Sequence, residues 1–125
     1  MNKYILILCC FYCTLFSEIK LPENGSHLRY IHILFEWDQE PNATAYNFQT
    51  SSQSNFNILN LDIIEETTVY LDTESFTWSL PWYCRVRPIY DDGSVGPWSS
   101  VSSFSTDDPI LTNLDVNIYD ESQYL

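Results

Sequence analysis

Apolar and polar residues alternate clearly over residues 82–99, WYCRVRPIYDDGSVGPWS. Every second residue from Trp82 is apolar, whereas Arg85 and Arg87 fall on the opposite face, which is the pattern of a half-buried strand. The Asp-Asp-Gly sequence at 91–93 is typical of a turn before a second strand. We predict that this stretch is the last hairpin of a small antiparallel sandwich and that it contains no catalytic residues.

The same alternation predicts strands elsewhere in the chain. Residues 29–37 (RYIHILFEW) read as a central strand that ends in a large aromatic residue, Trp37. Residues 45–50 read as a second strand, with Tyr46 and Phe48 facing inward. Further strands are expected at 56–59, 67–71 and 101–105, and alternation at 76–80 leads into the hairpin.

Turn-forming residues separate these segments at intervals of about ten positions. No segment shows a helical period long enough for a crossover between parallel strands. About five to seven short strands with such spacing are typical of an all-β sandwich. In its last strand, Trp98 and Phe104 are expected to share one face.

Segments from four regions, taken in order, resemble a fibronectin type III domain of the extracellular bacterial kind. They are FEW at 35–37, AYNFQ at 45–49, YCRVRPIYDDG at 83–93 and GPWSSVSSF at 96–104. The likeness covers about residues 21–106 and implies an immunoglobulin-like β-sandwich of about seven antiparallel strands. It also implies that Trp37 is the core tryptophan and that Tyr46 is an inward aromatic of the third strand.

The resemblance places the hairpin as well. It implies that Arg85 and Arg87 lie in the penultimate strand and that Trp98 opens the last one. Two residues depart from the family pattern. Trp82 stands where the family has a tyrosine that ties the corner to the backbone, and Cys84 stands where Trp or Val is commoner.

The N-terminus has the layout of a secretory signal peptide. A short, weakly positive start precedes an uncharged apolar run over residues 4–16, and the small residue Ser17 follows. We predict a signal peptide at 1–17, a sandwich domain at 18–106, and a protein that is secreted, periplasmic or at the cell surface, with no stable membrane insertion after cleavage. The alternative for this run is a buried N-terminal strand.

The C-terminal residues 107–125 are predicted to be a linker or the start of a following domain that is missing from this chain. Their last part, DVNIYDESQYL, resembles the segment that joins such a module to the β-propeller of secreted arylsulfotransferase-like proteins. This weaker resemblance implies an alternative function, in which the chain is the N-terminal fragment of an exported enzyme whose catalytic propeller is absent.

The formal net charge is −12, from 17 acidic and 5 basic residues. Such a chain is repelled by phosphate backbones and anionic membrane surfaces, so we expect no nucleic-acid partner. An acidic exterior suited to extracellular conditions is the simplest interpretation, and cation binding is the alternative.

Cys84 is the one cysteine of the body of the chain, because Cys9, Cys10 and Cys13 lie in the apolar leader. After cleavage no internal disulfide is possible, and no second cysteine or nearby histidine stands at zinc-ligand spacing. We expect Cys84 to be buried and inert.

The candidate interaction surface consists of Trp82, Arg85, Arg87 and Trp98, in which guanidiniums could stack on indoles. A structural ladder on the outer sheet is the favoured interpretation, and a carbohydrate or carboxylate surface is the alternative. Carbohydrate binding requires that Trp78, Trp82 or Trp98 be exposed.

Other chemistry-bearing residues are interpreted more simply. His27 and His32 are five positions apart, so they fall on opposite faces of an extended chain and are expected at the surface. Residues 91–94 lack the other ligands of a calcium loop. The glycosylation-like triplets at Asn24 and Asn42 are taken as turns.

The sequence therefore predicts a non-catalytic extracellular module that acts as a spacer or as an interaction domain. We expect no enzymatic activity, no catalytic residue, no metal and no cofactor, since no convergent set of polar groups is recognisable. The partner is an unidentified protein or glycan, and the module is expected to be a monomer.

Overall fold

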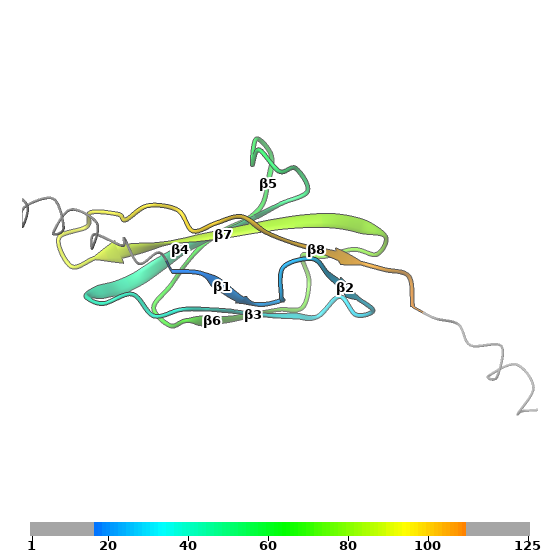
Figure 1. Ribbon diagram of the computed structural model, residues 1–125, viewed down its shortest axis with the longest axis horizontal. Coiled ribbons are helices and arrows are strands. Elements are labelled where there is room, and N and C mark those ends of the chain that lie inside the picture. The colour runs from blue at the N-terminus through cyan, green and yellow to red at the C-terminus, as the bar shows by residue number, and fades with distance from the viewer. Residues whose placement is uncertain (1–16, 110–125) are drawn as a thin grey trace, which may run out of the picture.

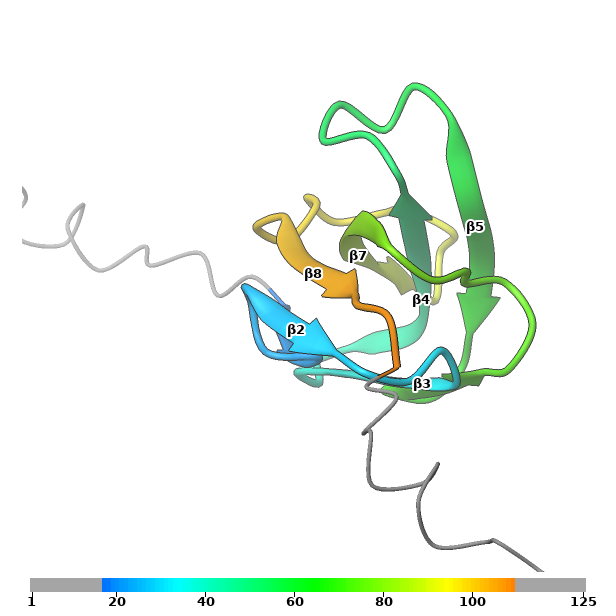
Figure 2. The same cartoon turned by 90° about the vertical axis from the view of Figure 1, so that its right-hand side faces the viewer.

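The computed structural model describes residues 17–109 of the chain, which form two packed β-sheets (Figures 1 and 2). The predicted signal peptide up to residue 16 and the predicted tail from residue 110 lie outside the described residues. No helix in residues 17–109 has the length and apolar character needed to cross a membrane.

The described residues form eight strands. The three-stranded sheet has the order β1 (Ile19–Leu21), β3 (Ile33–Trp37), β6 (Val69–Asp72). The five-stranded sheet has the order β2 (Ser26–Leu28), β8 (Ser102–Thr106), β7 (Leu80–Tyr90), β4 (Ala43–Ser51), β5 (Leu59–Glu65). The prediction of an all-β sandwich is confirmed.

Strand direction departs from the prediction at one edge of the five-stranded sheet. β2 runs parallel to β8, with Ser26 opposite Phe104, whereas the other described strand pairs are antiparallel. β2 has only three residues. So short a segment shows no period-2 pattern, and its direction depends on where the chain crosses from one sheet to the other.

Aromatic side chains from both sheets fill the core. Trp37 of β3 stacks on Phe48 of β4, with 5.2 Å between ring centroids and 13° between ring planes. Tyr46 meets the same indole edge-on at 5.9 Å. The other residues of this core cluster are Leu28, Ile33, Phe35, Phe76, Trp82, Cys84, Val86 and Phe104. The inward placement predicted for Trp37, Tyr46 and Phe48 is confirmed.

Several predicted strand limits are wrong. The central strand β3 begins at Ile33 and not at residue 29. The edge strand β5 covers Leu59–Glu65, so it follows the predicted 56–59 segment and does not coincide with it. Phe56 lies in the loop before it, with a φ of 57°. Its side chain is buried by a contact with Arg85, a residue distant in sequence, so local alternation misplaces it.

The segment between the last two strands is also irregular. β8 begins only at Ser102, and residues 95–99 follow β7 through separated backbone bonds, in which Gly96 N donates to Pro88 O and Ser99 N donates to Val86 O. A Cβ atom on Gly96 would lie 2.5 Å from Cγ of Pro88. Glycine is therefore needed for this close approach.

Cys84 lies in the core and is fully buried. Its thiol makes one long contact, 3.6 Å from Sγ to the carbonyl oxygen of Ser102. Burial disfavours the thiolate and raises the pKa of Cys84 to about 12. The predicted burial is confirmed.

Truncation of a core ring tests the role of the aromatic packing. Phe48→Ala is expected to lower the free energy of unfolding by about 3–5 kcal/mol, because it removes ring contacts and leaves a cavity between the sheets. Urea denaturation followed by tryptophan fluorescence measures this loss. The control Leu71→Ala, at an exposed position of β6, should stay within about 0.5 kcal/mol of the parent. Equal losses of stability in both variants would contradict the placement of Phe48 in the core.

Thiol labelling tests the environment of Cys84, in a chain whose Cys9, Cys10 and Cys13 are replaced by Ser. With a pKa of about 12, roughly one thiol in ten thousand is ionised at pH 8. Ellman's reagent should therefore react slowly with the native protein and rapidly after addition of urea. Rapid labelling of the native protein would refute the buried position.

Candidate functional site

Arginine and aromatic side chains form a stack on the outer face of the five-stranded sheet. We call this stack the ladder; it contains Phe56, Arg85, Trp98 and Arg87. The Arg85 guanidinium carbon lies 4.2 Å from the ring centroid of Phe56 and 4.1 Å from that of Trp98. The Arg87 guanidinium carbon lies 4.3 Å from the Trp98 centroid. Both cations therefore make cation–π contacts with one indole.

Amide side chains of β4 hold the two guanidiniums. Arg85 donates from Nε and Nη2 to Oε1 of Gln49, at 3.0 and 2.8 Å. Arg87 donates from Nε to Oδ1 of Asn47, at 3.1 Å. These partners stand directly opposite in register, Gln49 across from Arg85 and Asn47 across from Arg87. Regular antiparallel pairing of β4 with β7 thus brings the groups together.

An acidic residue completes this polar layer. Asp62 of β5 accepts through Oδ1 from Nδ2 of Asn47 at 2.8 Å and from Nε2 of Gln49 at 3.2 Å. Partial burial, and then the positive charge of Arg87, lower the pKa of Arg85, while the charge of Asp62 opposes this shift. The carboxylate therefore offsets part of the repulsion between the two guanidiniums.

The structure brings together three of the four predicted surface residues. Arg85, Arg87 and Trp98 meet in the ladder, but Trp82 does not belong to it. Trp82 is only 5% exposed and faces the core, where its Nε1 donates to Oγ1 of Thr106 at 3.1 Å. Including Trp82 was wrong because period-2 alternation puts it opposite to the arginines.

Trp98 differs from its prediction in another way. It lies in the loop before β8 and packs on the outer face, whereas Phe104 of β8 is buried in the core. The two residues therefore do not share a face. The irregular path of the loop after Gly96 breaks the alternation on which that prediction was based.

Sequence reasoning missed one ladder residue, Phe56, and the two amide residues that hold the guanidiniums. Asn47 and Gln49 alternate with the inward Tyr46 and Phe48 in β4, so the same pattern could have marked them as partners of the arginines. Phe56 carries no such signal, because it stands alone in a polar loop and reaches Arg85 only through the fold.

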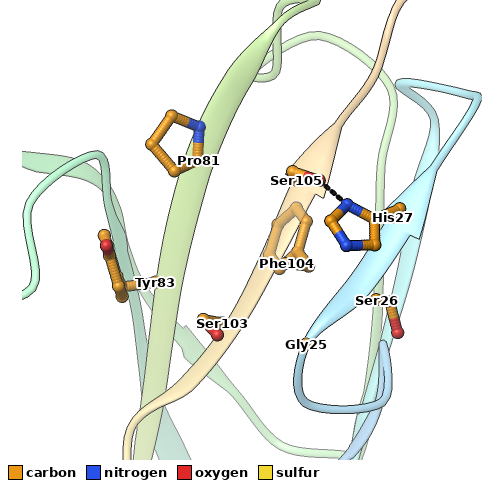
Figure 3. Close-up of a pocket in the computed structure, with 8 residues that line it drawn as sticks. All are labelled: Gly25, Ser26, His27, Pro81, Tyr83, Ser103, Phe104 and Ser105. Atoms are coloured by element: carbon orange, nitrogen blue, oxygen red, sulfur yellow. Dashed lines mark hydrogen bonds between the residues drawn. The ribbon is translucent and has the colours of Figure 1, made fainter.

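A shallow hollow lies over β2, β8 and β7 of the same sheet (Figure 3). Its lining residues are Gly25, Ser26, His27, Pro81, Tyr83, Ser103, Phe104 and Ser105. Nδ1 of His27 lies 2.8 Å from Oγ of Ser105 and 3.6 Å from Oδ2 of Asp107. The hydroxyl of Ser105 in turn donates to Oδ1 of Asp107 at 2.8 Å.

This serine, histidine and aspartate contact is not the arrangement of a nucleophilic triad. A triad needs the serine hydroxyl on one imidazole nitrogen and the carboxylate on the other. Here both groups approach Nδ1 of His27, and the proton of Ser105 goes to Asp107. The hydroxyl is therefore not activated. The His27 side chain is 76% exposed, which confirms its predicted surface position.

The other candidate residues occupy turns. Oδ1 of Asp92 accepts from the backbone N–H and the hydroxyl of Ser94, and these bonds lower the pKa of Asp92. Asn24 accepts from the backbone N–H of Ser103, and Asn42 has a φ of 65°. Residues 17–109 contain no cluster of three or more side chains suited to hold a metal ion.

Removal of one guanidinium tests the structural role of the ladder. Arg85→Ala is expected to lower the free energy of unfolding by about 1–2 kcal/mol, through loss of two cation–π contacts and the paired bonds to Gln49. Chemical denaturation measures the change. Arg29→Ala, at an exposed position, serves as the matched control and should change stability little. An Arg85 variant as stable as the parent would rule out a structural ladder.

A scan against protein-family models and a search of curated proteins gave no match for this chain. Solved structures do match it. An Fn3-like protein from Clostridium thermocellum aligns with a TM-score of 0.55 and 20% identity, covering 79% of this chain and 97% of its own. A β-1,2-glucanase from Parabacteroides distasonis aligns with a TM-score of 0.54 and 16% identity, covering 76% of this chain.

These identities are low, so the likeness concerns the fold alone. The match spans 13% of the glucanase chain, so it concerns a small part of that protein. Neither structure is described as an arylsulfotransferase, and that part of the resemblance stays a prediction. The two sheets together with the Fn3-like neighbour show that this chain has an all-β, immunoglobulin-like sandwich fold similar to that of Fn3-like proteins.

Proposed function

We propose that this chain is an exported, non-catalytic β-sandwich module that serves as a spacer and presents an interaction surface in an extracellular or cell-surface protein. The Fn3-like neighbour supports the non-catalytic part of this proposal. The geometry of the described domain and the chemistry of its outer face support the remainder.

The positions of the two chain ends carry the spacer role. In Figure 1 the described chain enters in the left half of the view and leaves at the right-hand end of the long axis. A module that is entered and left at different points along its length holds flanking segments apart, which is what a spacer requires.

The outer face of the five-stranded sheet favours a protein partner over a glycan. Sugar rings stack on open aromatic faces, but Trp82 is buried, Trp78 is half-buried, and Trp98 already contacts two guanidiniums. The chain instead presents ordered arginine side chains beside exposed aliphatic ones such as Ile64 and Val95. Such mixed surfaces are common where proteins meet.

Export is the part of this proposal that a cell-based experiment tests most directly. The full chain is fused ahead of an alkaline phosphatase that lacks its own leader, which becomes active only outside the reducing cytoplasm of a bacterial host. We expect phosphatase activity outside the cytoplasm for the full chain, and its loss when residues 2–17 are deleted. A full-chain fusion that accumulates in the cytoplasm without phosphatase activity would refute the proposed extracellular role.

A further inference from the structure

Arg87 lies at one end of the ladder, and its aromatic surroundings differ from those of Arg85. Arg85 has an aromatic ring near it on two sides, Phe56 at 4.2 Å and Trp98 at 4.1 Å. Within residues 17–109, Arg87 contacts only one ring, that of Trp98 at 4.3 Å. The stack therefore alternates ring, cation, ring, cation, and it stops on a cation.

A hollow lies next to this terminal cation. Its lining residues are Asn47, Asp62, Ile64, Arg87, Ile89 and Val95. Two of its aliphatic side chains are well exposed, Ile64 at 68% and Val95 at 49%. Covering such exposed branched side chains with another apolar group lowers the free energy, because apolar surface is removed from water. The hollow thus combines a guanidinium with aliphatic walls.

Hydrogen-bonding capacity also remains in the hollow. Arg87 uses its Nε for Asn47, and none of the described residues accepts from its terminal nitrogens. Asp62 accepts both of its bonds through Oδ1, while Oδ2 accepts none from the described residues. A group that enters the hollow therefore meets a carboxylate oxygen able to accept a proton donor.

These features select among possible ligand groups. A carboxylate would be repelled by the negative charge of Asp62 and by the net charge of −12 on the chain. An aliphatic group would cover the walls but gain nothing from the guanidinium. An aromatic ring gains from both, since its face attracts the cation and its edge packs on aliphatic carbon. A phenol adds a hydroxyl that can donate to Asp62.

We propose that this hollow binds a tyrosine side chain of a partner protein, whose ring packs on the guanidinium of Arg87 between Ile64 and Val95. The phenol hydroxyl donates to Oδ2 of Asp62. The inference rests on the proposed interaction role and gives that role a ligand chemistry. Tyrosine is enriched in protein interfaces because its ring is large and rigid and its hydroxyl is polar.

A titration with a minimal probe tests the site. The ¹⁵N-labelled full chain is titrated with N-acetyl-L-tyrosinamide, which is neutral, and amide signals are followed by NMR. We expect saturable shifts centred on Ile64, Val95 and Arg87. N-acetyl-cyclohexylalaninamide has similar bulk but neither a π face nor a hydroxyl. It should bind at least about fivefold more weakly, because it loses one cation–π contact and also the hydrogen bond to Asp62. Equal binding of the two probes, or shifts centred elsewhere, would overturn the proposal.

Two surface variants locate the site independently of ladder stability. Ile64→Asp puts a charge on one wall of the hollow and should abolish the tyrosinamide shifts. Leu71→Asp is the matched control, since Leu71 is 59% exposed in β6 of the other sheet, and it should bind as the parent does. Undiminished binding by Ile64→Asp would overturn the proposal.

A third variant tests the cation itself. Arg87→Met should weaken tyrosinamide binding about fivefold. It should also reduce the difference between the two probes to the part that comes from the hydroxyl bond to Asp62. The export fusion and the probe titration test different claims, so a negative result in one does not affect the other. An exported fusion without tyrosinamide binding refutes this site alone, whereas binding by a chain that is not exported refutes the extracellular role alone.

Discussion

The indole of Trp37 stacks on the ring of Phe48 across the space between the two sheets, and the other features of the domain depend on this contact. Because Phe48 must face inward, its neighbours in β4, Asn47 and Gln49, face outward. β7 pairs with β4 in register and buries Val86, so its arginines also face outward. The aromatic core thereby orients the polar outer face.

The outer face places two guanidiniums close together, which costs free energy in isolation. Three kinds of contact offset that cost: the shared indole of Trp98, the amide oxygens of β4 and the carboxylate of Asp62. In a chain with net charge −12, this small cationic area also differs from its surroundings. A surface of this kind combines a structural role with the capacity to recognise a partner.

The two groups that resemble catalytic features contribute little chemistry. Both Ser105 and Asp107 approach the same nitrogen of His27, so the imidazole has no separate base position facing the hydroxyl. Cys84 is buried, and its raised pKa keeps it protonated. These placements agree with the proposed module, whose function lies in its shape and surface.

The sequence alone determined the parts of the molecule in which a long strand faces the core on one side. Alternation in β3, β4 and β7 was sufficient to place Trp37, Phe48 and the two arginines, because burial of one sheet face requires a period of two. The sandwich class followed from the spacing of turns between such strands.

Only the tertiary structure decided the remainder. The parallel direction of β2, the outward packing of Trp98 and the contact of Phe56 with Arg85 all involve residues in very short strands or loops. Contacts made there join residues distant in sequence, so no local period encodes them. The predicted ladder was therefore correct in its arginines and in Trp98, wrong in Trp82, and incomplete without Phe56.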